Sequence, residues 1–199
     1  MDETPQYPWM LWIDGVGGIW LSFSDEVILG SGGHAAANYI PFMGDLLPEH
    51  ARIRRDSDWY VLAPSGPVRL NRKPVHTPQV LAEGDEVQLG ETVRLRFRCP
   101  HPLSHSLRIE PFGGSTTWPR SHAVVLMDRW CMLGPRGCAH VVVPMWTAEV
   151  VLLRFPNGLR LRFPRKFAVN GQVWAEDRPL NPPCRVEGPG FSFFAEPLV

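Results

Sequence analysis

The sequence predicts an all-β protein made of two copies of one β-fold, and three observations support this prediction. Apolar residues alternate with arginine in Val93–Arg98 and in Leu159–Phe163, and a period of two puts the apolar side chains on one face of a strand. The 18 glycines and 21 prolines interrupt the chain so often that an all-helical fold is excluded. Similar motifs also recur at an offset of roughly 100 residues, which is one domain length rather than a solenoid period.

The first strands are expected in three short apolar runs, Trp9–Ile13, Ile19–Phe23 and Val27–Gly30, which Gly or charged turns separate. Further runs and turn clusters follow along the whole chain, including Asp56–Asp58 and Glu83–Asp85. Many short strands at spacings of about 8–12 residues are typical of an antiparallel sandwich or barrel.

The internal repeat sets the predicted domains. The matching segments are Glu26–Gly30 with Trp130–Gly134, Ile40–Pro41 with Val143–Pro144, Ala51–Leu62 with Val150–Leu161, Asn71 with Asn170, and Leu95–Phe97 with Phe191–Phe193. We therefore predict a first domain over residues 7–111, a linker over 112–118 and a second, shorter domain over 119–199. The second domain is expected to need the first to complete its core. Phe112 and Trp118 are expected to fill the joint because aromatic side chains bury a large area.

Charge and cysteine content restrict the possible partners and the compartment. Twenty basic residues balance twenty acidic ones, whereas a nucleic-acid-binding domain is usually strongly basic. The N-terminal segment does not resemble a signal peptide, and no apolar run is long enough to span a membrane. The four cysteines, Cys99, Cys131, Cys138 and Cys184, form no CxxC pair. We therefore predict a cytoplasmic protein with reduced thiols, no metal site, no cofactor and no membrane partner.

The sequence contains no motif that predicts an enzyme. It has no Gly-x-Ser-x-Gly elbow and no phosphate-binding glycine loop after a strand. The pair Ser104–His105 is adjacent, and neighbours on a strand point to opposite faces. We therefore predict that the protein is not an enzyme.

The first copy resembles a forkhead-associated (FHA) domain. The residues that carry the resemblance are Val27–Gly30, His50–Ile53, Asn71, Leu81–Gly90 and Leu95–Phe97. The resemblance covers about 75 residues and implies a β-sandwich of about eleven strands, whose loops at one end bind phosphothreonine peptides. It also implies a bacterial signalling setting. The predicted fold is thus two FHA-like β-sandwich domains in tandem, the second shorter and degenerate.

The phosphate-binding motif of the family is incomplete in the first copy. Ser31 follows Gly30 where the family has an arginine, and Leu47 replaces the serine three residues before His50. Asn71 is present, but Arg72 replaces the following glycine. A phosphate dianion needs charge-assisted donors, which Leu47 does not supply. Arg72 is the candidate substitute donor, whereas His50 and Asn71 are expected to remain for structural reasons.

The second copy departs further from the family pattern. It retains Arg136 two residues after Gly134, and the pair Asn170–Gly171. The loop before Val150 is shorter than its counterpart and has no Ser-x-x-His. A packing role against the first copy is therefore the main prediction for this half.

Three functions remain open, in order of preference. The first is a non-enzymatic protein-interaction module of FHA type with phosphothreonine recognition lost or altered. The second is an atypical but working reader of phosphothreonine peptides. The third is a polyanion or nucleic-acid binder that uses arginine faces such as Arg94, Arg96 and Arg98. The predicted partner is a protein, with its phosphorylation on threonine left open.

Overall fold

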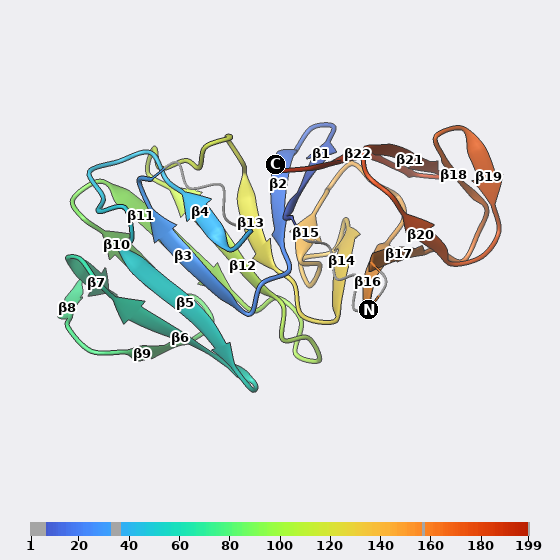
Figure 1. The fold of residues 1–199 in the computed structure, drawn as a ribbon. Coiled ribbons are helices and arrows are strands. Elements are labelled where there is room, and N and C mark those ends of the chain that lie inside the picture. The colour runs from blue at the N-terminus through green and yellow to red at the C-terminus, as the bar shows by residue number, and fades with distance from the viewer. Residues whose placement is uncertain (1–6, 33–36, 157, 199) are drawn as a thin grey trace.

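The structure, a computed structural model, describes residues 7–32, 37–156 and 158–198. These residues form strands, turns and loops, and they contain no helix that could cross a membrane. One sheet has twelve strands and each of two others has five, so the all-β prediction is confirmed. Figure 1 shows two halves side by side, with β1, β2 and β13 between them.

The twelve-stranded sheet runs through both halves. Its order is β19 (Gln172–Trp174), β18 (Phe167–Val169), β21 (Cys184–Gly188), β22 (Phe191–Pro197), β1 (Trp9–Ile13), β2 (Gly17–Ser22), β13 (Ala123–Leu126), β12 (Leu107–Phe112), β11 (Val93–Arg98), β10 (Glu86–Leu89), β7 (Val68–Leu70) and β8 (Lys73–Val75). Neighbouring strands are antiparallel except at the centre, where β2 and β13 are parallel.

Each five-stranded sheet belongs to one half. The first is β4 (Tyr39–Pro41), β3 (Glu26–Gly30), β5 (Ala51–Asp56), β6 (Trp59–Pro64) and β9 (Gln79–Leu81). The second is β15 (Val141–Val142), β14 (Trp130–Gly134), β16 (Val150–Phe155), β17 (Gly158–Arg162) and β20 (Arg178–Leu180). Because β5–β6 and β16–β17 hold the same place, the predicted match of Ala51–Leu62 with Val150–Leu161 is confirmed.

The two small sheets pack on opposite faces of the large one. On β2, Trp20 belongs to the core of the first half, whereas Ile19 and Leu21 belong to the core of the second. On β13, Val124 and Val125 divide in the same way. Since successive side chains of a strand point to opposite faces, both faces of these central strands are buried. That explains why their sequences are continuously apolar rather than alternating.

The N-terminal hairpin completes the core of the second half. Strand β1 pairs with β22, and Leu11 and Ile13 lie in the second core although they belong to the predicted first domain. Conversely, Leu126 of β13 lies in the first core. The short second copy therefore receives the strands that its own sequence lacks. The large sheet also joins the two predicted domains directly, because β12, which ends at Phe112, pairs with β13.

The alternation in β11 is confirmed, since Val93, Leu95 and Phe97 are fully buried.

The expectation that Trp118 fills the joint between the halves is wrong. Trp118 is 68% exposed, whereas Thr117 beside it is fully buried and pairs with Phe42. Because neighbours in an extended segment point to opposite sides, burying Thr117 turns Trp118 to the surface.

Candidate functional site

The loop end of the first half is assembled on a glycine. Gly30 ends β3, and a Cβ atom there would lie 1.9 Å from the carbonyl oxygen of Pro48, so the loop before β5 packs directly on this strand. Ser31 holds the same loop, because its amide donates to Leu47 O at 3.1 Å and its hydroxyl donates to Leu46 O at 2.8 Å. The hydroxyl of Ser31 is therefore used within the protein.

His50 ties three segments together and is almost fully buried. Its Nδ1 accepts a hydrogen bond from the amide of Leu47 at 3.1 Å, and its Nε2 lies 2.8 Å from Pro67 O and 3.1 Å from the amide nitrogen of Gly90. Its carbonyl oxygen accepts the amides of Ser65 and Gly66. A Cβ atom on Gly66 would lie 2.7 Å from the imidazole, which requires glycine there. His50 thus supports the loops and does not present a free donor.

The described part of these loops carries no lysine or arginine that could bind a phosphate. The loop residues 31–32, 42–50 and 65–67 include no lysine or arginine. Leu47 exposes an apolar side chain. Arg52, on the adjoining strand, pairs with Glu26 at 3.0 Å and Glu49 at 2.7 Å. The acceptor carboxylate of Asp45 also lies in this loop, where a hydrogen bond from Thr92 lowers its pKa.

Asn71 and Arg72 lie elsewhere, in the two-residue turn between β7 and β8. Both have positive φ, at 50° and 69°. The amide of Asn71 donates to Glu86 O at 2.8 Å, and its Oδ1 accepts the amide of Glu86 at 3.0 Å. No hydrogen bond or ion pair among the described residues joins this turn to Ser31, Leu47 or His50.

The second copy shows that this asparagine is structural. Asn170 and Gly171 form the turn between β18 and β19, again with positive φ. The amide of Asn170 donates to Arg185 O at 2.9 Å, and its Oδ1 accepts the amide of Arg185 at 2.8 Å. The same pair of bonds occurs in both halves, so each asparagine attaches a hairpin turn to the neighbouring strand. Arg136 is exposed and pairs with Glu149 at 3.2 Å.

Sequence reasoning missed two contributors to the loop end. Ser65 and Gly66 lie in a Pro- and Gly-rich segment, and nothing in its spacing indicates the contact with His50. Tyr39 donates its hydroxyl to Pro48 O in a short hydrogen bond and accepts the amide of Gly32 at 2.7 Å. Burial raises the pKa of this tyrosine. No sequence signal distinguished Tyr39 from an ordinary core tyrosine.

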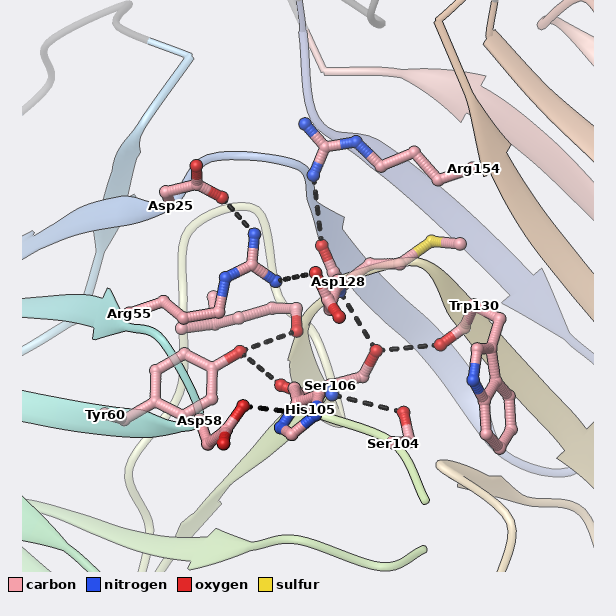
Figure 2. Close-up of polar contacts among 12 residues, drawn as sticks. Asp25, Arg55, Asp58, Tyr60, Ser104, His105, Ser106, Asp128, Trp130 and Arg154 are labelled. Atoms are coloured by element: carbon pink, nitrogen blue, oxygen red, sulfur yellow. Dashed lines mark hydrogen bonds and ion pairs between the residues drawn. The ribbon is translucent and has the colours of Figure 1, made fainter.

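A polar cluster joins the two halves at the end of β13 (Figure 2). Arg55 forms a short ion pair with Asp25 and a second pair with Asp128 at 2.5 Å. Arg154 occupies the equivalent place on β16 and donates to Met127 O at 3.3 Å. Burial lowers the pKa of Arg154. The charged groups of this cluster are thus paired within the protein, which is typical of a structural joint rather than of a ligand site.

The same cluster continues to the segment before β12. The hydroxyl of Ser106 donates to Trp130 O at 2.7 Å and accepts the amide of Asp128 at 3.0 Å. Tyr60 donates to His105 O at 2.7 Å, as Figure 2 shows. Segments from both halves are therefore linked by side-chain hydrogen bonds to backbone groups.

Ser104, from the first predicted domain, and His140, from the second, form a serine–histidine pair, but the direction of its hydrogen bond is wrong for catalysis. Nε2 of His140 lies 2.9 Å from the hydroxyl of Ser104. Nδ1 accepts the amide of Met132 at 3.0 Å, so the proton is on Nε2 and His140 donates to Ser104. A general base would have to accept the hydroxyl proton. Burial lowers the pKa of His140 to about 4, with smaller contributions from His101 and Arg108.

The remaining candidate chemistry is weak. Over the residues that the structure describes, no three His, Cys, Asp or Glu side chains converge as metal ligands. All four cysteines are unpaired; Cys131 is buried, as its alternation with Leu133 predicts, and Cys99 is exposed. On the arginine face of β11, Arg96 pairs with Glu86 at 2.6 Å and Arg98 with Glu83 at 3.0 Å. These carboxylates neutralise most of the ladder, which disfavours polyanion binding.

Comparison with known proteins finds no matching family model and no matching curated protein. Solved structures do match. One is an FHA domain from a structural and functional analysis of phosphothreonine-dependent FHA domain interactions, with 30% identity, 48% of this chain and 99% of that chain covered, and a TM-score of 0.35. Another is the FhaA FHA domain in complex with an intracellular domain, with 28% identity, 41% and 91% covered, and a TM-score of 0.30.

A third is the FHA domain of the CT664 protein from Chlamydia trachomatis, with 17% identity, 42% and 89% covered, and a TM-score of 0.30. The low TM-scores mean that the superpositions themselves locate no site. All of these matching structures are FHA domains, and each corresponds to less than half of this chain. The chain is therefore similar to the forkhead-associated family over 41–48% of its length.

Proposed function

We propose that this protein is a non-enzymatic protein-interaction module of FHA type in which the first-half loops have lost or altered phosphothreonine recognition. The observation that carries the proposal is the use of the Ser31 hydroxyl in an internal bond to Leu46 O, beside the exposed apolar side chain of Leu47. Neither residue offers a charge-assisted donor to a phosphate.

The electrostatics of the loop end support the same proposal. Glu49 and Asp45 lie in the loop that would meet a peptide, and Arg52 is held by two carboxylates. A phosphate approaching this surface would meet negative charge without a compensating cation. Removing one charge-assisted hydrogen bond costs about 1.5–3 kcal/mol, and two such donors of the family motif are absent.

Calorimetric titration with matched pairs of phosphothreonine and unphosphorylated peptides tests the proposal. We expect the two forms of each peptide to bind equally, because each missing donor weakens phosphate binding by roughly tenfold or more. The double variant Ser31→Arg, Leu47→Ser should gain a preference for the phosphorylated peptides. Micromolar, phosphate-dependent binding by the unmodified protein would contradict the proposal.

A variant of Arg72 tests whether this residue replaces the missing phosphate donors of the family motif. It is exposed in the β7–β8 turn and has no carboxylate partner among the described residues. If phosphate-dependent binding were found, its loss in Arg72→Ala and its retention in Arg69→Ala would identify Arg72 as that donor.

We also propose a cytoplasmic location, which the four unpaired thiols support.

A further inference from the structure

A groove of about 1180 Å³ lies away from the loop end, beside the small sheet of the second half. Its walls include Val142 at the edge of β15, Trp12 of β1 and Arg108 of β12. Arg120 and His122, which precede β13, and Glu110 of β12 also line it. Ser31, Leu47 and His50 do not line it, so it is separate from the site discussed above.

One wall of the groove is a sheet edge. Strand β15 is the terminal strand of its sheet, paired on one side with β14. The amide of Val143 donates to Gly134 O at 2.8 Å, toward β14. Because successive backbone groups of a strand point to opposite sides, the N–H and C=O of Val142 point away from β14 into the groove. No bond from another described segment meets them, and Val142 is half-buried.

In the first half, the chain itself covers the equivalent edge. Pro41 of β4 pairs with Gly30 as Val142 pairs with Gly134, so the two residues correspond. This register corrects the expected match of Ile40 with Val143, because Ile40 corresponds to Val141. The extended segment Thr116–Trp118 lies along β4: Trp118 N donates to Pro41 O at 3.0 Å, and Met43 N donates to Thr116 O at 2.9 Å.

The two halves therefore differ at one defined place. The edge of β4 has an added antiparallel segment, centred on the bridge between Phe42 and Thr117. The edge of β15 has none among the described residues, although a groove runs beside it. An exposed strand edge is a ready template for pairing with another extended chain.

We propose that this groove binds an extended segment of a partner protein, which adds as an antiparallel strand to β15 and carries an acidic side chain. The charges of the lining select that chemistry. Arg108 is neutralised by Glu110 at 2.5 Å, and it donates to His140 O at 3.0 Å. Arg120 is exposed without a carboxylate partner among the described residues. The groove therefore has one uncompensated positive charge beside the open strand edge.

The test uses the full chain and two fluorescein-labelled heptapeptides of alternating Thr and Val, identical except that one carries two Glu and the other two Lys. Fluorescence anisotropy should show binding of the Glu peptide and at least tenfold weaker binding of the Lys peptide, about 1.4 kcal/mol. Val142→Pro removes the edge N–H, and Pro41 at the corresponding position of β4 shows that this strand geometry accepts proline. This variant should weaken Glu-peptide binding about tenfold, whereas Val142→Thr should not.

Two further measurements prevent an ambiguous result. Arg120→Glu should reverse the preference between the two peptides. In the unmodified protein, the amide resonance of Val142 should shift on adding the Glu peptide, and this readout does not depend on any variant folding. Unchanged binding by a folded Val142→Pro variant, an unmoved Val142 resonance, or no binding up to about 1 mM would each overturn the proposal. Because the peptides carry no phosphate, retained binding by Ser31→Arg, Leu47→Ser separates this groove from the loop end.

Discussion

In the first half, the loop after Gly30 is tied to the loop before β5 by Ser31 and by the buried His50. In the second half, Gly134 begins the corresponding loop, but Arg136 points into solvent and pairs with Glu149. Both halves nevertheless keep the asparagine that attaches a hairpin turn to the next strand. The contacts that maintain the sheets are thus shared, whereas the loop ends and strand edges that could meet a partner differ.

At the joint between the halves, Arg55 and Arg154 make similar backbone hydrogen bonds, but their side chains have different partners. The amide of Arg55 donates to Asp25 O, and the amide of Arg154 donates to Arg129 O, at 2.7 and 2.8 Å. The side chain of Arg55 then finds two carboxylates, whereas that of Arg154 reaches a backbone carbonyl. Repeated backbone contacts therefore preserve the fold while the side chains diverge.

The largest expected effect tests whether the halves are one folding unit. We propose that the repeats at residues 7–111 and 119–199 fold together because each core uses strands from the other repeat. Leu11→Ala should lower the free energy of unfolding by about 2–5 kcal/mol and loosen the second half. Leu126→Ala should have a similar cost and loosen the first half. Urea denaturation with hydrogen exchange measures both, and loosening confined to the mutated repeat's own half would contradict the proposal.

The second prediction concerns the ion pairs at the joint. Arg55→Met should lower the free energy of unfolding by about 3 kcal/mol, because Asp128 would be left partly buried without its partner. The matched control is Arg54→Met on the same strand, whose exposed pair with Asp56 should contribute less than about 1 kcal/mol. Equal effects of the two substitutions, measured by urea denaturation, would show that Arg55 does not hold the joint.

The third prediction concerns the pH dependence that the buried His140 gives to stability. The pKa of His140 in the folded protein is about 4, below its usual 6.5, so the unfolded chain binds more protons between these values. The free energy of unfolding should therefore fall as the pH drops from 6.5 to 4, by up to about 3 kcal/mol, with the full stability present above 6.5. His140→Gln should flatten this dependence, whereas the exposed control His76→Gln should leave it. An unchanged slope in His140→Gln would assign the dependence to other groups.

The smallest expected effect concerns the exposed tryptophan of the segment that covers β4. Trp118→Ser should change the free energy of unfolding by less than about 0.5 kcal/mol, because the side chain is largely exposed and the bond to Pro41 uses its backbone. Thr117→Val, by contrast, should cost about 1–3 kcal/mol, since the buried Thr117 hydroxyl bonds Pro119 O and Ser121. Thermal unfolding compares the two, and a large loss in Trp118→Ser would restore the expected packing role of this residue.

The candidate site could be predicted only in part. The family resemblance predicts that His50 braces a loop, and its ring contacts with Leu47, Pro67 and Gly90 are consistent with that role. The family motif places Asn71 with Ser31 and Leu47 by order along the chain. In the structure, Asn71 lies in a hairpin turn and bonds Glu86. Order along a sequence does not reveal which loops meet at one end of a sandwich.

Local patterns by themselves determined the fold class, most strand positions and the face that each strand buries. In β11, for example, the period-two alternation predicts the buried face, because successive side chains of a strand point to opposite faces. Only the tertiary structure decided which strands pair across the repeats. Strands β1, β2 and β13 are apolar on both faces, so their composition does not distinguish one core from the other. Their partners are set by long-range packing, and for the same reason only the structure distinguished the covered edge of β4 from the open edge of β15.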